Sequence, residues 1–137
     1  MPSAVAYADG ASRGNPGPAG AGWVLCDRAD RPVARGHLFL GHKTNNEAEY
    51  LAAACALEAA LALGIDHLLL RADSELLVRQ VAGRYWVKNE RLQPLYRRLM
   101  DLSARFGSFV AQHVPRERNR LADAEANQAI DEAHGGG

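Results

Sequence analysis

The chain has little cysteine and no long apolar run, and each absence excludes a class of protein. Cys26 and Cys55 form neither a metal-ligand spacing nor a disulfide framework, and both lie among apolar residues, as buried small side chains do. Glu58 and Asp66 interrupt the most apolar region before it reaches the roughly 18 residues of a membrane span. The amino end lacks the basic start and apolar run of a secretory signal. We therefore expect a cytoplasmic protein without membrane contact, with residues 1–133 as a single domain and residues 134–137 as a disordered glycine-rich tail.

The chain also lacks an excess of charge of either sign, because 16 basic and 16 acidic residues cancel. That balance alone argues against a strongly nucleic-acid-binding protein. The charges are not evenly distributed along the chain, however. Residues 79–120 contain ten basic and three acidic residues, a net charge of +7, which leaves −7 on the rest of the chain. The neutral total therefore conceals a basic segment, and the excess of acids in the rest needs an explanation.

The hydrophobic pattern changes its period along the chain and predicts an α/β fold. Alternation or short apolar runs predict strands at 3–9, 20–27, 32–41, 67–73 and 108–114, the fourth buried on both faces. Longer periodic stretches predict helices at 44–64, 74–83, 89–107 and 119–133. Polar residues at three helix starts are the expected N-caps: Thr44 or Asn45, Ser74 and Asn119. We expect a mixed five-stranded sheet, with an antiparallel meander of three strands and two further strands, flanked by helices.

Residues 10–22 are rich in glycine, proline and alanine and are predicted to form a loop. The stretch lacks the lysine of a phosphate-cradling loop and does not match the dinucleotide fingerprint, so a nucleotide cofactor is not favoured. A backbone with few side chains allows a large polymer to approach, and its amides can face a sugar edge or a phosphate.

Four acidic residues occupy positions where a fold ordinarily has other residue types. Asp9 and Asp73 each end a predicted strand, and an aspartate there is more often a turn former or a helix cap. Glu49 and Asp123 each lie on the helix face that should meet the sheet, whereas acids such as Glu125 fall on faces expected to be solvated. Strand ends gather at one edge of an open sheet, where sites form, so we expect the four carboxylates to converge.

Convergence of four carboxylates would limit the chemistry of the site. Two like charges about 4 Å apart repel by about 4 kcal/mol at an effective dielectric constant of 20, so either several carboxyls are protonated or cations lie among them. Oxygen ligands favour Mg²⁺ or Mn²⁺ over zinc. Two such ions about 4 Å apart can activate a water and stabilise the leaving oxygen of a phosphodiester, as in nucleases.

Four motifs in order, YADGASRGNPGPAGAGWVL, TNNEAEYLAA, ADSELLVRQ and VPRERNRLADAEAN, resemble the ribonuclease H family of type 1, which cleaves the RNA strand of RNA/DNA hybrids. The resemblance runs from Tyr7 to about Ile130. It implies that the family's four acidic residues correspond to Asp9, Glu49, Asp73 and Asp123. In the family these residues hold two Mg²⁺ or Mn²⁺ ions, and hydrolysis leaves a 5′-phosphate and a 3′-hydroxyl.

The resemblance also implies contacts to the substrate. Family members recognise RNA through 2′-hydroxyls near the glycine-rich loop and the asparagine pair, which correspond to Gly14, Asn15, Asn45 and Asn46. Ser74, next to Asp73, is a further expected substrate contact.

Two departures from the family pattern matter. Better-known members carry a histidine in a mobile loop before the last helix, whereas this chain has Arg116 and Arg118 in a shorter loop, as in a VPRExN subgroup without that histidine. An arginine near the scissile phosphate could stabilise charge or help product release in its place. His113 lies earlier, in the predicted last strand, and a structural role is favoured for it.

The second departure is the absence of a basic protrusion that grips the hybrid in some relatives. Trp86 and Lys88 could instead contact the DNA strand by stacking and charge, while a hydrophobic plug between two helices is an equal alternative for Trp86. We expect hybrid binding to be weaker than in relatives with the protrusion and strongly dependent on salt.

Other functions remain open at this stage. A hybrid-binding module without catalysis would share the fold, but it would be favoured by loss of a carboxylate, and all four are present. An integrase-like or exonuclease function is disfavoured by the NNEAE and GNPGPAG motifs. Double-stranded RNA is a second candidate partner, and no feature requires more than a monomer.

Overall fold

The computed structural model describes residues 3–134, so most of the predicted glycine tail, residues 135–137, lies outside the described residues. In chain order the elements are β1 (Ser3–Ser12), β2 (Gly17–Cys26), β3 (Pro32–Lys43), α1 (Asn45–Ala62), β4 (His67–Ala72), α2 (Glu75–Val81), α3 (Leu92–Ser103), β5 (Ser108–His113), the short 3-10 helix η1 (Arg116–Arg118) and α4 (Arg120–Ala133). Within the described part of the chain, no helix is long and apolar enough to span a bilayer. The predicted order of strands and helices is confirmed, and η1 is the element that the pattern did not predict.

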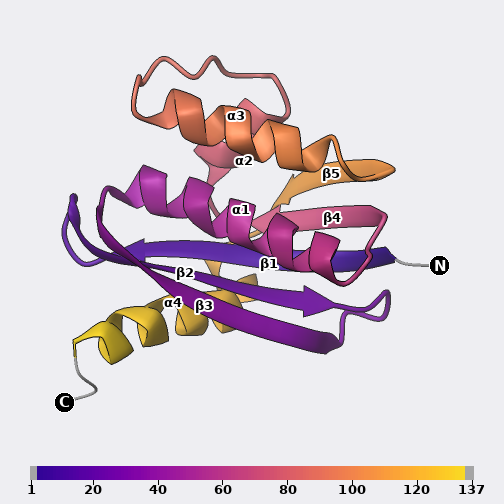
Figure 1. Ribbon diagram of the computed structural model, residues 1–137, viewed down its shortest axis with the longest axis horizontal. Helices are drawn as coiled ribbons and strands as arrows, with labels where there is room; N and C mark the ends of the chain where they lie inside the picture. Colours follow the sequence, from indigo (N-terminus) through magenta and orange to yellow (C-terminus); the bar gives the residue numbers. More distant parts are fainter. Residues whose placement is uncertain (1–2, 135–137) are drawn as a thin grey trace.

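The five strands form a mixed sheet in the order β3-β2-β1-β4-β5. β1, β2 and β3 pair antiparallel as the predicted meander, and β4 pairs parallel with both β1 and β5. Figure 1 shows α1, with α2 and α3 beyond it, on one face of the sheet and α4 on the other. The predicted fold class is therefore confirmed, and the sheet is a central layer between helices.

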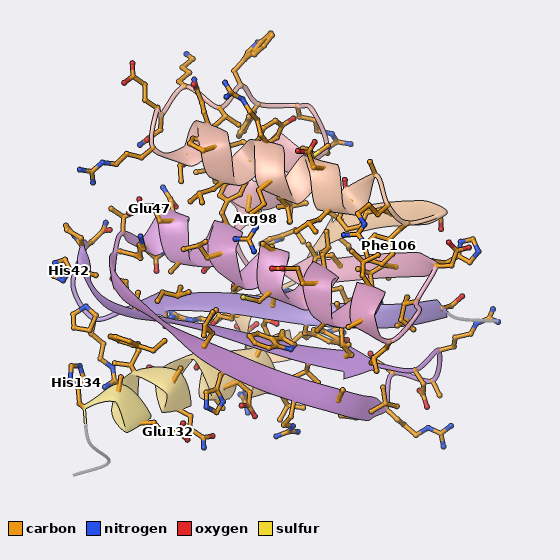
Figure 2. All side chains as sticks on the ribbon, in the orientation of Figure 1. His42, Glu47, Arg98, Phe106, Glu132 and His134 are labelled. Carbon is orange, nitrogen blue, oxygen red and sulfur yellow. The ribbon has the colours of Figure 1, made fainter. Side chains whose placement is uncertain are left out.

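α1 packs closely on the sheet because its inner face consists mostly of alanine. Ala52, Ala53 and Ala56 are fully buried, and Leu57 lies beside them in the core. Thr44 caps the helix in a capping box with Glu47, which confirms one of the two expected N-caps. On the outer side α3 packs against α1, and Arg98 of α3 points toward α1 in Figure 2, where it forms an ion pair with Glu58.

The predicted loop at residues 10–22 was wrong, because most of it is strand. β1 continues to Ser12, β2 begins at Gly17, and Gly10 pairs with Ala21 across the ladder. The glycines serve close packing. A Cβ on Gly10 would lie 2.2 Å from the backbone of Ala48 in α1, and one on Gly22 would lie 2.1 Å from the carbonyl oxygen of Ala122 in α4. The true loop is residues 13–16, which are exposed.

Two expected burial patterns were also wrong. β4 is not buried on both faces, because Leu68 and Leu70 are buried while Leu69 and Arg71 are partly exposed. α4 packs on β1, β2 and β3, so the same face of β4 has less cover. Glu125, expected to be solvated, is 7% exposed and contacts Nδ1 of His37 at 2.6 Å.

We predict that Gly22→Ala destabilises the protein by about 3 kcal/mol or more, because the added methyl collides with rigid backbone of α4 and the helix must move. Chemical denaturation measures the change in the free energy of unfolding. Gly64→Ala is the matched control: its Cβ meets nothing within 4 Å, and its positive φ alone should cost about 1 to 2 kcal/mol. An equal or smaller loss for Gly22→Ala would contradict the close approach.

Candidate active site

Three carboxylates meet at one edge of the sheet, where β1 and β4 stop pairing. Asp9, Glu49 and Asp73 each offer a carboxylate oxygen, and these oxygens all lie within 4.8 Å of one another. Asp123 of α4 borders the same hollow of about 450 Å³, and its proximity contributes to raising the pKa of Asp9. The structure thus brings together the four acids that the sequence singled out.

The strand register explains the meeting of the two aspartates. Ala8 and Ala72 are the last paired residues of the parallel β1 and β4 strands, so Asp9 and Asp73 are the next residues on each. Glu49 reaches the cluster because Gly10 has no side chain and lets α1 approach, which also brings the Gly10 amide close enough to lower the pKa of Glu49. Asp123 lies in the first turn of α4 on the other face of the sheet.

Burial and mutual repulsion disfavour negative charge in this cluster. Loss of solvent, followed by the nearby charge of Glu49, raises the pKa of Asp9, which is 5% exposed. Burial and then the charge of Asp73 raise the pKa of Glu49, while the Gly10 amide and, more weakly, Arg116 act in the opposite direction. A divalent cation would relieve this repulsion, and the donor set of carboxylate oxygens fits a hard ion such as Mg²⁺ or Mn²⁺.

Polar side chains that the sequence analysis missed surround the four acids. Asn127 of α4 donates to the side chain of Asp123 at 3.3 Å, and Arg13 donates in turn to Oδ1 of Asn127 at 3.3 Å. Asn119 donates to Oδ1 of Asp73 at 3.4 Å, although the pattern predicted only a helix cap. The signal for Asn127 was present, since it lies four residues after Asp123 on one helix face.

The expected RNA contacts lie near the edge of the hollow. Asn15 in the 13–16 loop accepts a hydrogen bond from the backbone N–H of Asn45 at 3.0 Å, which ties the loop to the start of α1. Asn45 borders the hollow, and Gly14, Asn15 and Asn46 are exposed. Ser74 also borders it, and its hydroxyl caps α2 by accepting from the backbone N–H of Leu77.

The two arginines of η1 lie apart. Arg116 borders the hollow that contains the four acids, whereas Arg118 borders a different cavity, beside Tyr7 and Cys26. The placement of Arg118 therefore gives no support to a role at the carboxylates. His113 is exposed at the end of β5 and does not line the hollow.

The hydrophobic-plug alternative for Trp86 was wrong. Trp86 is 88% exposed in the segment between α2 and α3, and Lys88 is exposed close by. The neighbouring Tyr85 is held by Arg79, whose guanidinium lies 5.2 Å from the ring centroid and donates to the hydroxyl at 2.9 Å. The segment therefore presents an aromatic ring and basic groups to solvent.

Comparisons with known proteins show which family this chain resembles. A family model described as "Reverse transcriptase-like" matches residues 7–129. The chain is 46% identical to "Ribonuclease HI" of Halobacterium salinarum, covering 93% of this chain and 64% of that protein. It is 37% identical to "Ribonuclease H" of Alkalilimnicola ehrlichii, covering 93% of this chain and 94% of that one. The chain spans only about one to two thirds of the length of the first curated relatives that it matches.

A solved structure resembles this one closely. It is the crystal structure of LC11-RNase H1 in complex with an RNA/DNA hybrid, with a TM-score of 0.91 and 39% identity. The match covers 95% of this chain and 98% of that one. The likeness therefore extends over almost the full length of both chains.

We predict that the metal-free protein loses stability as the pH rises from about 4, the usual pKa of a carboxyl group. The raised pKa values of Asp9 and Glu49 mean that the folded state binds more protons than the unfolded state, so the free energy of unfolding falls until the pH passes those raised values. Asp9→Asn should flatten this profile and stabilise the metal-free protein at pH 8 by about 2 to 4 kcal/mol, the scale of one close repulsion.

Denaturation profiles between pH 4 and 8 test this, with Asp101→Asn, an exposed change on α3, as the control that keeps the slope of the native protein. Added Mg²⁺ should raise the free energy of unfolding of the native protein by more than it raises that of the Asp9→Asn variant. Parallel profiles for the native protein and Asp9→Asn would contradict the electrostatic account.

Proposed function

The chain belongs to the ribonuclease H family of type 1, and we propose that it is an endoribonuclease that hydrolyses the RNA strand of RNA/DNA hybrids with two divalent metal ions. One observation carries the proposal: the carboxylate oxygens of Asp9, Glu49 and Asp73 lie within 4.8 Å of one another in a hollow that Asp123 also borders. The hybrid bound by the similar LC11 protein supports the substrate class.

The four acids are the residues that would hold the ions. When bound, two Mg²⁺ or Mn²⁺ ions would supply an activated water and stabilisation of the leaving oxygen, giving 5′-phosphate and 3′-hydroxyl ends. The chain itself contributes rigidity, because Asp9 and Asp73 extend directly from paired strands and α1, which carries Glu49, packs closely over Gly10. Arg116 adds positive charge at the rim, where it can stabilise a phosphate or assist product release.

The RNA strand would be recognised beside the acids. The hydrogen bond between Asn15 and Asn45 fixes the 13–16 loop against the start of α1. The backbone and side-chain amide groups of this neighbouring pair of segments are then available to the RNA strand: Gly14, Asn15, Asn45 and Asn46. Such groups suit a 2′-hydroxyl, which both donates and accepts and distinguishes RNA from DNA. Ser74 offers a further hydroxyl next to Asp73.

The DNA strand would meet the segment between α2 and α3. An exposed Trp86 can stack on a sugar or base, and Lys88 can pair with a phosphate. Without a basic protrusion this grip rests on few contacts, which supports weak hybrid binding, and the strong salt dependence expected from the sequence stays a prediction. Binding of Mg²⁺ or Mn²⁺, double-stranded RNA as a second partner, a monomeric state and a cytoplasmic location stay predictions from the sequence.

We predict that Asp73→Asn abolishes Mg²⁺-dependent cleavage of a hybrid with a labelled RNA strand, with a loss of at least about a thousandfold, because one ligand charge is removed. Asp101→Asn on α3 should retain full activity. The same labelled strand, presented in a hybrid, an RNA duplex and a DNA duplex with each metal, defines the substrate. Full activity of Asp73→Asn would reject the assignment, and hybrid binding without cleavage by the native protein would favour a binding module.

We predict that Trp86→Ala raises KM for the hybrid about tenfold, within the 1 to 3 kcal/mol expected for one stacking contact, and changes kcat less than about twofold. Because the ring is exposed, the free energy of unfolding should change by no more than about 0.5 kcal/mol. Phe39→Ala, a 41% exposed aromatic on β3, is the matched control and should leave KM unchanged. An unchanged KM for Trp86→Ala would exclude the stacking role.

A further inference from the structure

Asn119 is a buried polar side chain at the junction of three elements that carry site acids. It lies just before α4 and is 1% exposed. Its Nδ2 donates to the carbonyl oxygen of Ala8 in β1 at 2.9 Å and to Oδ1 of Asp73 after β4 at 3.4 Å. The backbone carbonyl oxygen of Asn119 accepts a hydrogen bond from the backbone N–H of Asp123 at 3.0 Å.

The orientation of this amide is fixed by its partners. A backbone carbonyl and a carboxylate only accept, so the NH₂ group must face both of them. Oδ1 therefore points the other way, and it has no hydrogen-bond partner among residues 3–134. It also does not cap α4, since no side-chain cap hydrogen bond is formed there.

An orphaned buried oxygen is a cost that an apolar side chain of similar size would avoid. This cost is offset only if the two hydrogen bonds that Nδ2 donates stabilise the arrangement of the groups that accept them. Both end at the carboxylate cluster: one on the residue that precedes Asp9, the other on Asp73 itself. The Asn119 side-chain amide thus connects the segments that carry Asp9 and Asp73, and its backbone carbonyl connects both to the start of α4, which carries Asp123.

We propose that Asn119 is a positioning residue that holds the Asp73 carboxylate in the orientation that binds metal, with the spacing between Asp73 and Asp9 set by the same side-chain amide. The inference rests on the proposed function, because it assigns a purpose to that site's geometry. Groups that orient metal-binding carboxylates in this way typically change metal affinity or activity by about 10- to 100-fold when removed.

The experiment compares Asn119→Ala and Asn119→Asp with the native protein. Calorimetric titration with Mn²⁺ alone, in the absence of nucleic acid, should show affinity falling at least about tenfold for Asn119→Ala. Asn119→Asp should lose more, because an isosteric carboxylate turns the donor into an acceptor and adds a like charge beside Asp73. Cleavage by Asn119→Ala should fall by a similar factor and recover in part at high metal concentration, while hybrid affinity without metal stays unchanged.

Tyr50→Phe is the matched control, because it also removes one buried hydrogen bond, from the Tyr50 hydroxyl to Oε1 of Gln80 at 2.5 Å, without touching the acids. It should lower stability and leave Mn²⁺ affinity native. If Asn119→Ala does not fold, Asn119→Ser supplies the test, since its hydroxyl can serve only one of the two acceptors and should give an intermediate Mn²⁺ affinity.

If Asn119→Ala kept the native Mn²⁺ affinity and the native metal dependence of cleavage, the positioning role would be overturned. The hydrogen bonds of Asn119 would then contribute only to stability. The two proposals fail separately. A native protein that binds Mn²⁺ but cleaves no hybrid would reject the proposed function, while the difference in Mn²⁺ affinity between native protein and Asn119→Ala would still decide the role of Asn119.

Discussion

The close approach of two helix backbones to β1 and β2 is the constraint on which the rest of the structure depends. α1 reaches the sheet over Gly10 and α4 reaches it over Gly22, and a single methyl group at either position would collide with helix backbone. Only at this separation does Glu49 arrive beside Asp9 from one face and Asp123 from the other. The small residues of this region therefore allow helices on both faces of the sheet to contribute acids to the same cluster.

The same closeness makes the cluster costly for the metal-free protein. Burial removes water from Asp9 and Glu49, and each then faces another acid at short range. Backbone hydrogen bonding compensates only part of this, through the Gly10 amide at Glu49. The electrostatic repulsion of the site is offset by stable elements around it. The capping box at Thr44 and the buried alanine face both stabilise α1, so a destabilised site can persist on a stable scaffold.

Local patterns predicted much of the fold, and long-range contacts account for what they missed. Alternation and caps give every strand and the helices longer than one turn, because those signals lie within a few residues of each other. The stretch at 10–22 is predicted as a loop because glycine and alanine are rare in isolated strands. The reasons for its glycines come later in the chain: α1 packs over Gly10, and α4 packs over Gly22. Glu125 is likewise buried, and its contact with His37 joins residues 88 apart in the chain. The four acids could be found because each breaks its own local pattern, whereas Asn119 satisfies the pattern of a cap and its contacts are visible only in three dimensions.

A chain of zero net charge can act on a polyanion if its charges are separated in space. The acids of the cluster repel phosphates, so a hybrid could approach them only once cations have neutralised them. The net +7 of residues 79–120 lies in segments that include Lys88 near Trp86 and Arg116 at the rim of the hollow. In the proposed function, these basic groups would attract the strands around the cluster rather than at it. Metal and substrate should therefore favour each other's binding, because each supplies charge of the sign that the other needs.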